Sequence, residues 1–267
     1  MMGDAIPKIF HQTFYTRNLP EKLKASVDLI CHLHPDWEYR FYDDEDIAIF
    51  IQTHYPAEIW RYFERIDPRY GAARADLFRY LLMYRIGGVY LDIKSAVTRP
   101  IQLQKDDKLL LSNWTRVNGE FDWGGHYELR HIAAGEYQQW HIVCVPGHPC
   151  IKAVIETVLQ NIDSYDPSLH GIGKKGVLRV TGPIAYTVAI HRIQSDYSHR
   201  IVDIKDELGF EYNVYQDQSH EKVFKSHYSV QTAPVVRLSW IKRQLNRVYA
   251  LIQAIHNARV RRQENNA

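Results

Sequence analysis

The segment 69–95 constrains the fold more than any other part of this chain. Residues 69–86, RYGAARADLFRYLLMYRI, are apolar around most of the circumference of a helix, which indicates a helix that is buried on several sides. Gly87 and Gly88 end this helix, and the run VYLDI that follows is rich in β-formers and continuous rather than alternating. The segment therefore predicts a buried helix that leads directly into an interior strand.

Predicted strands and helices alternate along the chain. The stretches 6–15 and 37–43 alternate between apolar and polar residues as strands do, and acidic residues open a predicted helix at 43–55. Other predicted strands lie at 108–114, 138–145, 200–205 and 222–228, and other predicted helices at 20–31, 56–65, 149–163 and 183–194. This alternation favours an α/β fold in which helices flank a single Rossmann-type mixed sheet.

Composition narrows the class of protein. A formal net charge of +2 over 267 residues is too small to indicate nucleic acid as a partner. The three cysteines form no C-x-x-C pair and are expected as reduced thiols, and no run approaches the roughly 18 apolar residues of a membrane span. The N-terminus lacks the pattern of a signal peptide, so we expect a cytoplasmic protein. The aromatic residues, 12% of the chain, have two interpretations, core packing or stacking on carbohydrate.

Charged residues inside the segment 69–95 are candidates for a binding site. Asp76 and Arg79 lie on one stripe of the predicted helix, where charges are costly unless they are matched. They form either an internal ion pair or a carboxylate and a guanidinium presented to a polyhydroxylated ligand. Asp92 ends the following strand, and α/β folds bind ligands at the carboxyl ends of their strands. Carboxylates at such an edge can hold a divalent cation on a diphosphate.

Three motifs together resemble a known family. IPKIFHQTF at 6–14, ARADLFRYLLMYRIGGVYLDIKS at 73–95 and VTGPIAYTVAI at 180–190 are similar to the sugar-nucleotide-dependent glycosyltransferases of family 32. That family includes α-1,6-mannosyltransferases and bacterial capsule and lipopolysaccharide enzymes. The resemblance spans about residues 5–235 and implies a GT-A fold, with a GT-A-like domain at 1–236.

The resemblance also implies a nucleotide diphosphate sugar as donor and transfer with retention of the anomeric configuration. Asp76 and Arg79 would contact the donor sugar, Tyr90 would lie against the nucleotide, and Asp92 would serve the metal and the donor. The residues implied for donor binding are His11, Gln12, Thr13, Asp76, Arg79, Tyr90 and Asp92, and those implied for catalysis are Asp76, Arg79, Asp92 and Lys94.

The sequence departs from the family pattern at Lys94, where most members have the second aspartate of a D-x-D motif. Three explanations stay open. In the first, Asp92 and a late histidine hold Mn²⁺ or Mg²⁺ while Lys94 turns aside, and His227 is preferred to His220 as that histidine. Alternatively, the Lys94 ammonium supplies positive charge to the diphosphate directly, or the site is degenerate and transfers nothing.

Two loops are candidates for substrate contacts. GIGKKG at 171–176 lacks the context of a phosphate-binding motif and is expected to form a mobile basic loop. FDWGGHYE at 121–128, in a long predicted loop at 115–137, is a candidate for acceptor binding by ring stacking. A two-step transfer would need a carboxylate below the anomeric carbon, for which Asp122 and Glu128 are candidates.

The C-terminal stretch predicts a basic amphipathic helix at 237–267. Apolar residues recur every three or four positions, and the basic residues lie mainly off that stripe. Such a helix either docks on the domain or, through residues 238–262, makes peripheral contact with the inner face of an anionic membrane.

The sequence thus predicts a hexosyltransferase of the retaining class, acting in surface polysaccharide or glycolipid synthesis on a glycan or lipid-linked acceptor. The alternative is a GT-A domain that binds nucleotide-sugar without transferring it. A glycoside hydrolase would need two facing carboxylates and leaves the family motifs unexplained.

Overall fold

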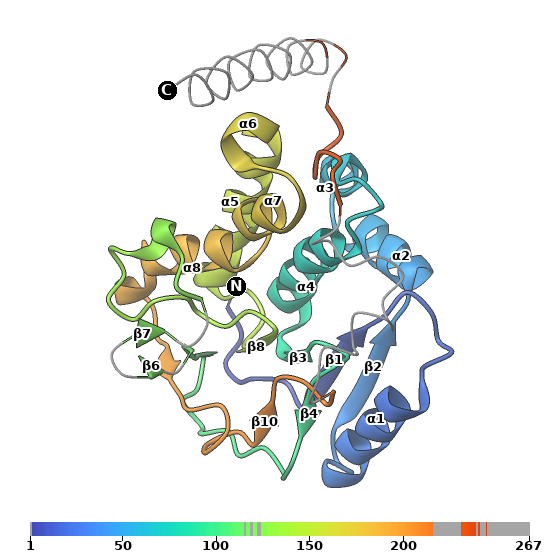
Figure 1. Ribbon diagram of the computed structural model, residues 1–267. Helices are drawn as coiled ribbons and strands as arrows, with labels where there is room; N and C mark the ends of the chain where they lie inside the picture. Colours follow the sequence, from blue (N-terminus) through green and yellow to red (C-terminus); the bar gives the residue numbers. More distant parts are fainter. Residues whose placement is uncertain are drawn as a thin grey trace, which may run out of the picture.

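The structure is a computed structural model, and it describes residues 2–114, 116–117, 120–121, 124–215, 231–238, 240 and 244. Its centre is a six-stranded sheet with the strand order β2-β1-β3-β8-β5-β9 (Figure 1). These strands are β1 (Ile9–Thr13), β2 (Glu38–Tyr42), β3 (Gly88–Leu91), β5 (Leu109–Leu111), β8 (His141–Cys144) and β9 (Arg200–Ile201). Strand β8 is antiparallel to both of its neighbours, and the other pairs are parallel. The sheet is therefore mixed, as the sequence predicts.

Two short strand pairs lie outside this sheet. Strand β4 (Ala96–Val97) pairs with β10 (Phe210–Glu211), and β6 (Arg116–Val117) forms a hairpin with β7 (Glu120–Phe121). The helices are α1 (Glu21–Leu33), α2 (Asp44–His54), α3 (Ala57–Arg65), α4 (Gly71–Ile86), α5 (Pro149–Ser164), α6 (Pro167–His170), α7 (Gly173–Val180) and α8 (Pro183–His191). Two short 3₁₀ helices lie at Tyr127–Leu129, between β7 and β8, and at Gln194–Asp196, after α8.

Helices cover both faces of the sheet, and strand β3 lies between the two layers. Val89 and Leu91 face the core that includes Ile30 of α1, while Tyr90 faces the larger core with α2, α3, α4, α5, α7 and α8. Figure 1 shows these helices on one side of the sheet and α1 on the other. A strand that is buried on both faces reads as a continuous apolar run, which is why VYL does not alternate.

Local sequence explains how α2 and α4 begin and end. Asp43 accepts hydrogen bonds from the backbone N–H groups of Glu45 and Asp46, and the Asp46 carboxylate accepts one from the Asp43 N–H, so a capping box starts α2. Helix α4 ends at Ile86 and is capped by Gly87, whose φ of 71° suits glycine, and β3 begins at Gly88 with φ 100°. The glycine pair turns the chain directly from the buried helix into the central strand.

Most of the predicted elements are present, and the predicted α/β fold class is confirmed. The predicted mobile basic loop at 171–176 is wrong, because residues 173–176 form the first turn of α7. Val177 and Val180 in that helix are buried, and a Cβ added at Gly176 would lie only 2.7 Å from Val235 Cγ2. The burial of this apolar face stabilises a helix where the glycines and lysines indicated a loop.

Two predicted elements fall largely outside the described residues. The late strand at 222–228 lies outside them entirely, and of the C-terminal helix at 237–267 only residues 237, 238, 240 and 244 are described. The division into a domain at 1–236 and a following helix stays a prediction. In the described part of the chain, no helix combines the length and the apolar character needed to cross a bilayer.

Gly88→Ala is expected to destabilise the protein by about 1–3 kcal/mol, because a side chain at this positive φ is strained. An added Cβ would also lie 2.7 Å from the carbonyl oxygen of Ile9 in the neighbouring strand. Gly71→Ala at the start of α4 is the control, because its Cβ would have no heavy atom within 4 Å. We expect that control to be neutral or to stabilise by about 0.4–1 kcal/mol. Urea unfolding measures both, and equal midpoints for the two variants would contradict the prediction.

Candidate functional site

Three charged side chains meet beside the carboxyl end of β3. The Arg79 Nη2 atom lies 3.3 Å from Asp76 Oδ1 and 3.0 Å from Asp92 Oδ1. The side chains of Arg79 and Asp76 are 5% and 4% exposed, whereas that of Asp92 is 22% exposed. The structure thus brings together the helix pair and the strand-end aspartate that the sequence singled out. Of these three residues, Asp92 is the one that reaches solvent.

Asp76 is held by neutral donors as well as by Arg79. Its Oδ2 accepts a hydrogen bond of 2.9 Å from the Thr181 hydroxyl, and its Oδ1 accepts one of 3.2 Å from the Gln139 amide. Burial raises the pKa of the Asp76 carboxyl, while Arg79 and Thr181 act in the opposite direction. Both oxygens of Asp76 are therefore engaged within the protein.

Arg79 is fixed from three directions. Its Nη1 donates to the backbone oxygen of Gln139 at 2.9 Å and lies 3.1 Å from the side-chain oxygen of the same residue. Its guanidinium carbon lies 4.8 Å from the centroid of the Tyr90 ring. Burial lowers the pKa of Arg79, but the nearby carboxylates, Asp92 first, outweigh burial and place the pKa above its usual value. The guanidinium is thus a permanent, oriented charge.

Gln139 and Thr181 were not predicted as site residues, although both contact the charged cluster. Thr181 belongs to the TGP sequence that supported the family resemblance, so a signal for it was present. Gln139 lies in a predicted strand and carries no motif. The hydroxyl of Tyr80 lies 3.1 Å from Gln139 Oε1 and 2.9 Å from the Thr181 backbone oxygen, which ties both residues to α4.

The main chain at Asp92 is anchored to both neighbouring strands. Its N–H donates to the Trp140 carbonyl at 2.8 Å, and its carbonyl accepts from the Gln12 amide at 3.3 Å. Tyr39 in turn donates to the Gln12 side-chain oxygen at 2.9 Å. Gln12 therefore holds the backbone of Asp92, and its predicted contact with a donor stays a prediction.

The other residues predicted to border the nucleotide make contacts with other parts of the protein. His11 is fully buried, with Nε2 3.0 Å from the Gly87 carbonyl and Nδ1 3.1 Å from the Tyr42 hydroxyl. Burial lowers the pKa of His11 to about 4, so the ring is neutral at pH 7. The Thr13 hydroxyl donates to the Tyr42 carbonyl at 2.9 Å, and Tyr90, only 1% exposed, lies beneath Arg79. Their contacts with a donor stay predictions.

Lys94 is held in an aromatic corner. Its Nζ donates to the Tyr212 hydroxyl at 2.7 Å and lies 4.0 Å from the centroid of the same ring. That ring in turn packs against Trp114 and Trp140, at centroid distances of 5.3 and 5.5 Å. Burial lowers the pKa of Lys94, and Asp92 opposes this effect. The three rings were not predicted as site residues.

Among the described residues, no group of three His, Cys, Asp or Glu side chains could hold a metal ion. His227, the predicted partner of Asp92, lies outside the described residues, as does Asp122.

Glu128, in the region predicted to bind the acceptor, is described, and its Oε1 lies 2.5 Å from Nη2 of Arg179. In the same region, Glu136 accepts from Trp114 Nε1 at 2.7 Å and lies 2.8 Å from His126 Nε2. Acceptor binding by this region stays a prediction.

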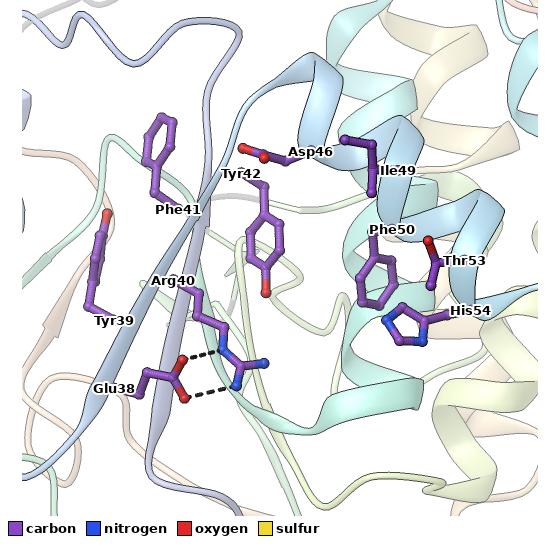
Figure 2. Close-up of a pocket in the computed structure, with 10 residues that line it drawn as sticks. All are labelled: Glu38, Tyr39, Arg40, Phe41, Tyr42, Asp46, Ile49, Phe50, Thr53 and His54. Atoms are coloured by element: carbon purple, nitrogen blue, oxygen red, sulfur yellow. Dashed lines mark hydrogen bonds and ion pairs between the residues drawn. The ribbon is translucent and has the colours of Figure 1, made fainter.

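A separate open pocket lies between β2 and α2 (Figure 2). Its residues are Glu38, Tyr39, Arg40, Phe41, Tyr42, Asp46, Ile49, Phe50, Thr53 and His54. Figure 2 shows Glu38 and Arg40 joined in an ion pair, with an N–O distance of 2.7 Å, and the side chains of Phe50 and His54 on the helix side. None of the predicted site residues lines this pocket.

Residues 20–114 match a protein family described as "Glycosyltransferase sugar-binding region containing DXD motif". The matched segment contains Asp76, Arg79, Asp92 and Lys94, and the predicted family resemblance is confirmed. Inositol phosphoceramide mannosyltransferase 3 of Schizosaccharomyces pombe is 38% identical over 112 residues, which are 42% of this chain and 30% of that protein. The chain spans between 30% and 40% of the length of such curated relatives.

Solved glycosyltransferases share the fold. The UDP-bound glycosyltransferase domain of the YGT toxin superposes with a TM-score of 0.52 at 8% identity, covering 92% of this chain and 89% of that domain. The PaToxG glycosyltransferase gives a TM-score of 0.50 at 18% identity, covering 94% of this chain and 87% of that one. The predicted GT-A-like fold is confirmed by these similarities.

Arg79→Met is expected to lower the free energy of unfolding by about 3–5 kcal/mol, because it leaves the buried Asp76 carboxylate without its charged partner. Lys152→Met is the control, since it removes an ion pair to Glu156 in which both side chains are more than half exposed. We expect the control to keep the melting temperature of the parent. Thermal unfolding followed by circular dichroism measures both. A parental melting temperature for Arg79→Met would contradict the structural role of the cluster.

Proposed function

We propose that this protein is a retaining hexosyltransferase that moves a sugar from a nucleotide diphosphate donor to a glycan or glycolipid acceptor. The observation that carries this proposal is the Asp76–Arg79–Asp92 cluster, which lies beside the carboxyl end of β3 within the segment that matches the glycosyltransferase family. Ligands of α/β folds bind at such strand ends.

The three residues have different roles in this proposal. Asp92 has the most exposed side chain of the three, so its carboxylate accepts hydrogen bonds from the donor sugar. Arg79 orients that carboxylate and stabilises the negative charge that develops on the leaving diphosphate. Asp76 is a positioning residue, because both of its oxygens are engaged with Arg79, Gln139 and Thr181.

The names of the relatives support a narrower substrate class. One is an inositol phosphoceramide mannosyltransferase and another is an initiation-specific α-1,6-mannosyltransferase, both from Schizosaccharomyces pombe. We therefore propose a mannosyl or closely related hexosyl donor, and a glycolipid with a polyol head group as the first acceptor to test. Synthesis of surface polysaccharide, including capsule and lipopolysaccharide, stays a prediction from the sequence resemblance.

The alternative is a GT-A domain that binds a nucleotide-sugar and does not transfer the sugar. This alternative is supported by Lys94, which occupies the position of the second aspartate of the motif. Release of nucleoside diphosphate from a donor, with or without an acceptor, separates an enzyme from a binding protein. Binding of a donor without turnover on any acceptor would favour the alternative.

Asp92→Asn is expected to lower donor turnover by about a hundredfold to a thousandfold, as the loss of one oriented polar group in an active site typically does. The assay measures UDP or GDP released from UDP-glucose, UDP-galactose or GDP-mannose, with and without inositol phosphoceramide. Asp28→Asn is the control, because it makes the same chemical change at an exposed position of α1. Equal turnover by the two variants would contradict the role of Asp92.

Peripheral membrane contact through residues 238–262 is a further part of the proposal, supported by the amphipathic pattern and by the glycolipid-linked names of the relatives. Cosedimentation with liposomes that contain anionic lipid, for the whole chain and for a variant ending at residue 237, tests it. We expect the shorter chain to lose most of its binding. Unchanged cosedimentation would exclude this segment as the membrane contact.

A further inference from the structure

The sequence Asp92-Ile93-Lys94 stands where the matched family is described by a DXD motif. At the third position of that motif, an ammonium replaces a carboxylate, so the formal charge changes from −1 to +1. The difference of two charges equals the charge of one divalent cation. Glycosyltransferases with this motif and fold typically use such a cation, so the substitution bears directly on how the site handles a diphosphate.

The described side chains around the motif do not fit a divalent cation. Mg²⁺ and similar hard cations need several oxygen ligands. Asp76 has both oxygens engaged, and Asp92 Oδ1 lies 3.0 Å from Arg79 Nη2 and 3.4 Å from the Tyr90 hydroxyl. Among the described residues, no third carboxylate, histidine or cysteine joins these two to complete a metal-binding group. A cation at Asp92 would also be repelled by two fixed positive charges, those of Arg79 and Lys94.

Lys94, by contrast, is built into the site as an oriented charge. Tyr212 accepts a hydrogen bond from its Nζ, and the Tyr212 ring is fixed by contacts with Trp114 and Trp140. The Lys94 carbonyl accepts from the Val214 N–H at 2.7 Å, so the backbone is anchored as well. This arrangement fixes the long side chain before any ligand binds and reduces the entropy lost on binding.

The ammonium also has donors left for a ligand. A lysine ammonium carries three N–H donors. Within the described part of the chain, the Tyr212 hydroxyl is its hydrogen-bond acceptor. The remaining donors suit the oxygens of a phosphate, for which lysine acts as a point charge.

We propose that Lys94 takes the place of the divalent cation in this protein and neutralises the donor diphosphate directly, while the buried charge of Arg79 acts on it from behind Asp92. This inference rests on the proposed function, since it assigns a partner to the diphosphate of the nucleotide-sugar donor. It predicts that nucleoside diphosphates bind the protein without metal. It also predicts that restoring the carboxylate at position 94 makes binding depend on metal.

Isothermal titration calorimetry with UDP and GDP, in EDTA and in MnCl₂, tests the inference. The parent chain is expected to bind at least one of them with the same affinity in both buffers. Lys94→Met is expected to lose about tenfold to a hundredfold in affinity in either buffer, the usual worth of a hydrogen bond to a charged group. Lys94→Arg keeps the charge and is expected to retain metal-free binding.

Lys94→Asp provides the sharpest comparison. We expect it to bind poorly in EDTA and to regain affinity in MnCl₂, because the second carboxylate of the motif is restored. Lys24→Asp, at an exposed position of α1, makes the same charge change away from the site and is expected to bind as the parent does. Thermal unfolding of each variant shows whether it is folded.

The outcomes separate this inference from the proposed function. Parental binding that needs Mn²⁺ would overturn the inference and leave the glycosyltransferase proposal standing. Metal-free binding that Lys94→Met retains in full would also overturn it. If neither UDP nor GDP binds in either buffer, both this inference and the proposed function are overturned.

Discussion

The buried guanidinium of Arg79 is the interaction on which the rest of the site depends. It sits in the interior of a helix with nine buried residues and lies within 3.3 Å of two carboxylates. A buried charge is tolerated only when it is paired and hydrogen-bonded, so its surroundings are closely specified. Gln139 before β8 and Thr181 before α8 complete the hydrogen bonds, and one charge thereby links three separate parts of the chain.

The same constraint leaves one end of the cluster open. Both oxygens of Asp76 are bound by Arg79, Gln139 and Thr181. The more exposed Asp92 is therefore the carboxylate that can contact a ligand at the strand end. Asp92 directly follows β3, and its backbone is fixed by Gln12 and Trp140, so the side chain projects from an anchored strand end. A site built on rigid elements holds its geometry better than one built on loops.

The aromatic residues serve mainly packing in the described structure. The largest fully buried side chains include six tyrosines: Tyr70, Tyr80, Tyr90, Tyr137, Tyr165 and Tyr186. Core packing therefore accounts for much of the aromatic content, which composition alone left open. Tyr212, with Trp114 and Trp140, also fixes the Lys94 ammonium, close enough to Asp92 and Arg79 for their charges to act on it.

The sequence by itself determined the buried helix, the glycine turn, the central strand and Asp92 at its end, because each follows from local periodicity or from the conformational freedom of glycine. Only the tertiary structure decided which distant residues complete the site. Gln139, Thr181 and Tyr212 lie 63, 105 and 118 residues from their partners Asp76 and Lys94. Local periodicity carries no information about which loops meet across a sheet. For the same reason, the sequence indicates a loop where the first turn of α7 forms, since the apolar partners that stabilise this helix come from elsewhere in the chain.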